Sequence, residues 1–449
     1  MLLLLLIFSN FLPFISTTSD YTNYSLIRFQ VDLTSNTLEK LEKFDSEFDE
    51  KSNSWKVLLD IWAEPSKSHP FVDVLVAPQF MRQFKSMLTS MEIGSLTILE
   101  EDIQKHISLE RKTMLETNQL ENKNRRKRRE LGSNWKNFNT HMYHPYSNMI
   151  DFMTVLADQK PDMVEKFKVA TSSQGRSIYG VRIHPPRKSN PEKPSIIIDA
   201  GVHAREWIAP GVALYIIKRL VEGYGNDDKI TKNLDKFDWY IFPQVNPDGY
   251  EYSRTEDRLW RKTRSKNETV NRYCHGADAN RNWGYRWGEV GANRTPCSNI
   301  YMGSHPYSEP EILGLKDYFT WQITNPMIYF SLHSYGQLFL SPWGYTNQRT
   351  DNHFDQQSAA REAVNAIKNT TGVIYKSGTI SEMMYPASGT SIDYMQHLGV
   401  PYIYGVELRP NELAGSGFNL PESFIKETGD EMIAALQAIS EHAVRVKKL

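Results

Sequence analysis

Short apolar runs alternate with amphipathic stretches over the larger, C-terminal part of the chain. Residues 194–201, "PSIIIDAG", form one such run, and residues 210–225 repeat apolar side chains at helical spacing. Three more runs rich in aromatic and β-branched residues follow at 239–250, 327–335 and 402–408. Buried strands joined by helices predict an open α/β sheet that is largely parallel.

The N-terminal part shows a different and shorter pattern. Period-two alternation predicts strands, and helical spacing predicts helices, within about a hundred residues. Together they predict a small α+β domain, followed by a connecting helix. The predicted strands are 24–33, 71–78 and 94–103, the predicted helices are 37–48 and 79–91, and the connecting helix covers 103–123.

The first 18 residues are apolar and end in small residues, which is typical of a secretory signal peptide. The segment lacks the usual Lys or Arg after Met1. A transmembrane anchor is the alternative, but Asn10 and Pro13 interrupt an already short run. Four N-x-S/T sequons become candidate glycosylation sites if the chain is secreted: Asn23, Asn267, Asn293 and Asn369.

A run of basic residues separates the two parts of the chain. Five consecutive basic residues, Arg125 to Arg129, follow the connecting helix. Behind a signal peptide this run predicts a processing site, cut after Arg128 or Arg129; a solvated loop is the other interpretation. The predicted division is a signal peptide at 1–18, a prodomain at 19–129 and a main domain at 130–449. The net charge of −1 on 449 residues gives no reason to expect nucleic acid as a partner.

Candidate zinc ligands stand where two of the apolar runs end. His203 and Glu206 follow the run at 195–200, and His333 ends the run at 327–333. Ligands bind at the carboxyl ends of strands in open sheets, and two imidazoles with one carboxylate leave a fourth zinc position for water. Glu407 ends a further run and is a candidate base for that water. A hydrogen-bonded loop histidine is the competing interpretation of a lone His-x-x-Glu.

Seven segments, three of which contain the residues just named, occur in the order found in one known family: "HAREW", "NPDGYEYS", "RLWRKTRS", "DANRNW", "SLHSYGQL", "YPASGTSIDY" and "GVELR". Over nearly the whole chain, the sequence resembles the secreted zinc metallocarboxypeptidases of the pancreatic A/B type. The resemblance implies a mixed, largely parallel eight-stranded sheet flanked by helices, preceded by an antiparallel α+β prodomain. It also implies a zymogen with one Zn²⁺ per chain that acts on peptide or protein C-termini.

The same resemblance implies a role for each matching residue. His203, Glu206 and His333 would bind zinc, Asp278 would support the first zinc histidine, Arg261 would stabilise the oxyanion, and Glu407 would be the general base. Asn280 and Arg281 would bind the substrate carboxylate, Tyr385 would close over it, and Arg205 and Tyr335 would lie on the substrate side. Cys274 and Cys297 can form a disulfide or remain two buried thiols, and the resemblance favours the disulfide.

Ile392 occupies the position where family members specific for basic residues have an acid. An apolar pocket base cannot compensate a buried cation, so we expect apolar or aromatic C-terminal residues to be preferred. Glu382 is the nearest carboxylate that would favour basic residues instead. Three alternatives remain open: a basic-residue carboxypeptidase, an inactive peptide-binding relative and another zinc amidohydrolase. We expect a secreted monomer without a membrane anchor.

Overall fold

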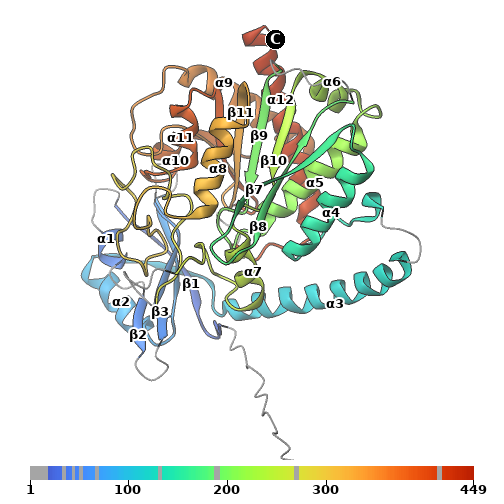
Figure 1. Ribbon diagram of the computed structural model, residues 1–449. Coiled ribbons are helices and arrows are strands. Elements are labelled where there is room, and N and C mark those ends of the chain that lie inside the picture. The colour runs from blue at the N-terminus through green and yellow to red at the C-terminus, as the bar shows by residue number, and fades with distance from the viewer. Residues whose placement is uncertain are drawn as a thin grey trace, which may run out of the picture.

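The computed structural model describes residues 19–32, 37–42, 46–49, 54–65, 70–129, 134–186, 193–266, 273–411 and 417–448. The predicted signal peptide and Asn267 lie outside these residues. Two β-sheet units build the molecule, a smaller one near the N-terminus and a larger one that the long helix α3 connects to it (Figure 1). Among the described residues, no helix combines the length and the apolar character needed to cross a membrane.

The larger unit contains a mixed sheet of eight strands in the order β13-β12-β14-β11-β9-β10-β8-β7. Four of the seven neighbouring pairs are parallel, including the three pairs at the centre, which confirms the predicted fold class. The strands are β7 Val164–Thr171, β8 Ser177–Ile183, β9 Ser195–Ala200, β10 Asp238–Phe242, β11 Pro326–Ser334, β12 Leu338–Ser341, β13 Lys376–Thr379 and β14 Tyr402–Leu408.

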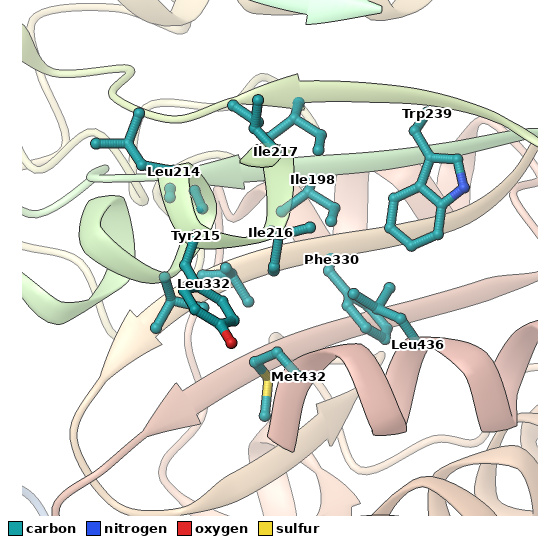
Figure 2. Close-up of a cluster of buried hydrophobic side chains, with 14 of the residues drawn as sticks. Ile198, Leu214, Tyr215, Ile216, Ile217, Trp239, Phe330, Leu332, Met432 and Leu436 are labelled. Carbon is teal, nitrogen blue, oxygen red and sulfur yellow. The ribbon is translucent and has the colours of Figure 1, made fainter. Parts of the chain in front are cut away.

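Helices bury both faces of this sheet, which explains why its central strands carry apolar side chains on both faces. Ile198 and Phe330 face the cluster that α5 and α12 cover, as Figure 2 shows, whereas their neighbours Ile197 and Tyr329 belong to the cluster on the other face. The helices are η1 Trp135–Asn137, α4 Tyr146–Gln159, α5 Ile208–Gly223, α6 Asp228–Lys236, α7 Pro247–Thr255, α8 Pro310–Trp321, α9 His353–Thr371, α10 Ile380–Met383, α11 Ser391–His397 and α12 Phe424–Lys447.

The smaller unit contains an antiparallel sheet in the order β4-β5-β1-β6. The predicted helix over 37–48 is wrong at residues 46–48, because residues 46–49 form a strand that pairs with residues 54–57. The elements are β1 Ser25–Gln30, α1 Thr37–Glu42, β2 Ser46–Asp49, β3 Ser54–Val57, β4 Leu59–Ala63, β5 Phe71–Val76, α2 Met81–Ser90 and β6 Leu96–Glu100.

The connecting helix α3, Ile103–Arg129, is longer than the sequence pattern predicts. It continues through the basic run, so the interpretation of Arg125 to Arg129 as a loop is wrong. Ile103 and Ile107 on the first turns pack with Leu26 and Leu75 of the smaller unit and with Leu259 of the larger unit. The helix therefore belongs to both units.

A buried acid at the start of α8 makes the stability depend on pH. Glu311 accepts a hydrogen bond from the Ser173 backbone N–H at 2.9 Å, and its Oε2 has no hydrogen-bond partner. Burial, together with the Glu309 carboxylate, raises the pKa of Glu311 to about 7. Its pKa in the unfolded chain is lower, so the stability falls as the pH rises from about 4.5 through 7.

We expect Glu311→Gln to remove this loss of stability at high pH. The variant should gain up to about 3 kcal/mol in free energy of unfolding at pH 8, relative to the unchanged chain, and much less at pH 5. Urea unfolding of both chains at the two pH values measures the difference. A gain of the same size at pH 5 and pH 8 would contradict the titration of Glu311 as its cause.

Candidate metal centre and substrate cleft

Three buried side chains converge at the carboxyl edge of the sheet. His203 and Glu206 lie in the turn between β9 and α5, and His333 is the penultimate residue of the neighbouring parallel strand β11. His203 Nδ1 lies 2.8 Å from Glu206 Oε1, and His333 Nδ1 lies 3.1 Å from both His203 Nδ1 and Glu206 Oε2. Of the described residues, these three form a group able to hold a metal ion.

The chemistry of this group fits zinc. Each histidine uses its Nε2 outside the group: that of His203 lies 3.1 Å from Asp278 Oδ1, and that of His333 lies 3.0 Å from Ser331 Oγ. Both Nδ1 atoms are therefore directed inward, together with one carboxylate, and three protein ligands leave a fourth position open. Burial alone would raise the pKa of Glu206, but the two histidines lower it, so the carboxylate stays ionised.

Glu407 lies beside the group without joining it. Strand β14 pairs with β11 so that Glu407 stands opposite His333, and its side chain lines the same cavity. Burial raises the pKa of Glu407 to about 8, and a nearby divalent cation would lower it again. A carboxylate that titrates near neutrality can accept and return a proton.

Arg261 and Asp278 form an ion pair against the metal group. Arg261 donates to Asp278 Oδ2 from Nη2 at 2.9 Å and from Nε at 3.2 Å, and its Nη1 lies 4.0 Å from Glu206 Oε1. Burial would raise the pKa of Asp278, but Arg261 and His203 lower it well below its usual range. One carboxylate thus fixes both a predicted zinc ligand and a cation that faces the cavity.

A second cation lies farther along the same cavity. Arg281 is almost fully buried; it donates to Gly291 O at 2.6 Å and to the Tyr385 hydroxyl at 3.1 Å. Asn280 is held by its Oδ1, which accepts from the Ser391 backbone N–H at 3.1 Å. The guanidinium, the amide and the phenol line one region of the cavity, a set suited to a carboxylate.

One part of the cavity, which has a volume of about 140 Å³, is lined by apolar side chains. Ile392, at the N-terminus of α11, is buried in this part, and a Cβ on Gly405 would lie 3.6 Å from it. Glu382 is not among the described residues that line the cavity. The other apolar lining residues in this part are Leu340, Ile380, Met384 and Ala387.

The smaller unit also contributes to the cavity wall. Edge strand β4 supplies Asp60, whose Oδ2 accepts from Arg205 Nη1 at 2.5 Å, and Trp62, whose ring packs on Phe418 with centroids 4.9 Å apart. Tyr335 packs on the same Phe418 ring from the main domain. The sequence reasoning missed Asp60, Trp62 and Phe418, because none of them stands in a segment that carried the resemblance.

The segment that carries Asp278, Asn280 and Arg281 is closed by a disulfide. Cys274 and Cys297 are bonded, which confirms the predicted pairing and rules out two free thiols. The loop that the disulfide closes also contains Asn293, which forms an isolated β-bridge with Tyr301. Closing a loop of this length restricts the unfolded chain and stabilises the fold.

Comparisons with known proteins agree with this geometry. A family model described as "Zinc carboxypeptidase" matches residues 149–435. The chain belongs to the zinc carboxypeptidase family. A second model, "Carboxypeptidase activation peptide", matches residues 34–110, so this carboxypeptidase has a zymogen propeptide, as predicted. As a family member it is a metallopeptidase that acts on peptides and uses zinc, and His203, Glu206 and His333 are the group able to hold that ion.

Two relatives and one solved structure show how far the similarity extends. The carboxypeptidase is 38% identical to Carboxypeptidase B of Astacus astacus, over 66% of this chain and 96% of that one. It is 32% identical to Carboxypeptidase A1 of Sus scrofa, over 98% of each chain. The crystal structure of Carboxypeptidase A from Helicoverpa armigera superposes with a TM-score of 0.81 at 25% identity, covering 96% of this chain and 99% of that one.

Proposed function

We propose that this zinc carboxypeptidase is a secreted exopeptidase that removes single C-terminal residues and prefers apolar or aromatic ones. The observation that carries the proposal is the arrangement along one cavity. The metal group, Glu407, Arg281 and Ile392 all line it, and we assign the point of cleavage to the metal group and Glu407. A substrate carboxylate on Arg281 would place its last side chain against Ile392 and its last peptide bond beside the metal group.

Each residue of the cavity then has a task. When bound, zinc polarises the scissile carbonyl and lowers the pKa of a water molecule. Glu407 takes the proton from that water and passes it to the leaving amine. Arg261 is placed to stabilise the charge that develops on the carbonyl oxygen. Asn280 and Arg281 bind the terminal carboxylate with charge-assisted hydrogen bonds, and the Tyr385 ring, which already touches Arg281, covers it.

The apolar end of the cavity sets the preference. A Lys or Arg side chain there would leave its cation without a carboxylate, whereas Phe or Leu would fill the space. Values of kcat/KM on peptides that differ only in a final Phe, Leu, Lys or Glu should favour Phe and Leu by roughly 10-fold to 100-fold. Ile392→Asp, which places a carboxylate at the pocket base, should shift the preference toward Lys.

The relative from Astacus astacus is named a carboxypeptidase B, so the basic-residue alternative needs an explicit test. If the unchanged enzyme releases Lys faster than Phe or Leu, the proposed preference is wrong. A C-terminal Glu also carries a charge that has no partner in this pocket. The Glu peptide therefore tests whether a charged side chain is disfavoured whatever its sign. Its slow release alongside Lys supports an apolar pocket.

We further propose that residues 1–18 are a signal peptide and that cleavage after Arg128 or Arg129 separates the propeptide from the catalytic domain at 130–449. Asp60 and Trp62 lie over Arg205 and Phe418, which would otherwise face substrate residues upstream of the cleaved bond. Glu110 on α3 adds two ion-pair contacts to Arg258. The propeptide thereby blocks long substrates, and the free enzyme is expected to be a monomer.

Uncleaved enzyme should hydrolyse a long peptide at least about tenfold more slowly than enzyme cut at the basic run, because residues of β4 line the cleft and would block its upstream part. A very short substrate should show a smaller difference. The matched control replaces Arg125 to Arg129 with Gln, so that an activating protease cannot cut there. Equal rates for the cut and the uncut enzyme on the long peptide would refute inhibition by the propeptide.

A further inference from the structure

A buried acid beneath the metal group has no part in the chemistry described above. Asp199 is the penultimate residue of β9, an otherwise apolar strand, and it is 1% exposed. The parallel register places it directly opposite Ser331 of β11, which is completely buried. A carboxylate in such a place destabilises the fold unless hydrogen bonds compensate it, so its partners are informative.

Both oxygens of Asp199 accept hydrogen bonds from hydroxyl groups. Ser331 donates to Oδ1 at 2.7 Å, and Tyr329, two residues earlier on β11, donates to Oδ2. A serine hydroxyl has only one proton, and Ser331 uses it on Asp199. The same Ser331 oxygen lies 3.0 Å from His333 Nε2 and can only accept there.

This proton count fixes the state of the His333 ring. Nε2 must carry the hydrogen, so in the neutral ring it is Nδ1 that presents its lone pair to the site shared with His203 Nδ1 and Glu206. His203 reaches the same state through direct contact with a carboxylate, because its Nε2 lies 3.1 Å from Asp278 Oδ1. The two histidines therefore have different supports, one a carboxylate and the other a carboxylate acting through a hydroxyl.

We propose that Asp199 is a positioning residue for zinc binding that acts through Ser331 to hold His333 in the metal-binding tautomer. The inference rests on the proposed role of His333 as a zinc ligand. Asp199 polarises the Ser331 hydroxyl, which makes the Ser331 oxygen a better acceptor for the His333 N–H and Nδ1 a better donor to the metal. Without the hydroxyl, Nε2–H loses this acceptor and the ring can rotate or adopt the other tautomer.

The test is the zinc affinity of the full chain, measured by competition with a chelator of known affinity, so that it does not depend on catalysis. Ser331→Ala should weaken zinc binding by roughly 10-fold to 100-fold, and Ser331→Thr, which keeps the hydroxyl, should retain most of the affinity. The matched control is Ser195→Ala at the other end of β9, where the buried hydroxyl donates to Thr324 O instead. It should leave zinc affinity unchanged.

Asp199→Asn separates action through Ser331 from a general effect on the core. As a single substitution it should weaken zinc binding. Combined with Ser331→Ala, it should cause no further loss of zinc affinity. Unchanged zinc affinity in Ser331→Ala would overturn the proposal, and so would losses that add in the double variant. If Ser331→Ala does not fold, unchanged zinc affinity in Asp199→Asn would overturn the proposal instead. His333→Ala tests the underlying assignment separately: if zinc binds that variant normally, the proposed function fails and not merely the relay.

Discussion

Replacing Glu407 with Gln should lower kcat by roughly 10²-fold to 10⁴-fold and leave the zinc in place. The carboxylate lies in the cavity beside the metal group, but it is not one of the three converging ligands. Gln keeps the size and the hydrogen bonding of the side chain and loses the ability to accept a proton. The measurement is kcat on a peptide with a free C-terminal Phe, together with the metal content of each protein.

Glu382→Gln is the matched control for this substitution. Glu382 lies in the short helix α10, near the pocket in sequence, but it does not line the described cavity. Its replacement should leave kcat and the preference for Phe over Lys unchanged. If Glu407→Gln retains more than about a tenth of the activity with zinc bound, another group must serve as the base.

Replacing Arg261 with Ala should lower kcat by roughly 10²-fold to 10³-fold, with a smaller effect on KM. The guanidinium is held by Asp278 and is the cation next to the metal group, where the carbonyl oxygen of a bound peptide gains negative charge. Arg261→Lys keeps the charge and loses the planar fork that Asp278 holds. It should recover only part of the rate.

The ion pair with Asp278 complicates this variant, because Asp278 also supports His203. Zinc affinity must therefore be measured beside kcat, and the rates must be compared at saturating zinc. A defect that saturating zinc removes would show that Arg261 acts through the metal site alone. A rate loss that persists with zinc bound is the result expected of a group that acts on the substrate.

The central strands and the metal group were predictable because local signals reinforce each other there. The apolar runs that end at Ala200, His333 and Leu408 become parallel neighbours in the sheet. Once the strands are parallel, the residues at their carboxyl ends must meet. His203, Glu206, His333 and Glu407 thus came from periodicity and spacing, and the order of the motifs supplied the rest of the cleft.

The contacts of the prodomain were not predictable in this way. Residues 37–48 carry apolar side chains at helical spacing, yet residues 46–49 form a strand, because they pair with residues 54–57, an interaction that local spacing does not reveal. Asp60 stands in a five-residue strand and resembles any solvent-facing acid until Arg205 is brought against it. Asp199 resembles an interruption of an apolar strand, and only the register with Ser331 shows its partners.

The most direct measurement compares two versions of one peptide, identical except that the last residue, Phe, has a free carboxylate or an amide. Enzyme cut at the basic run and loaded with zinc is incubated with each, and the products are identified by mass spectrometry. The proposed arrangement predicts loss of a single Phe from the free acid and at least about a hundredfold slower reaction with the amide, because Arg281 has no anion to bind. Equal cleavage of both peptides, or cleavage at internal bonds, would contradict it.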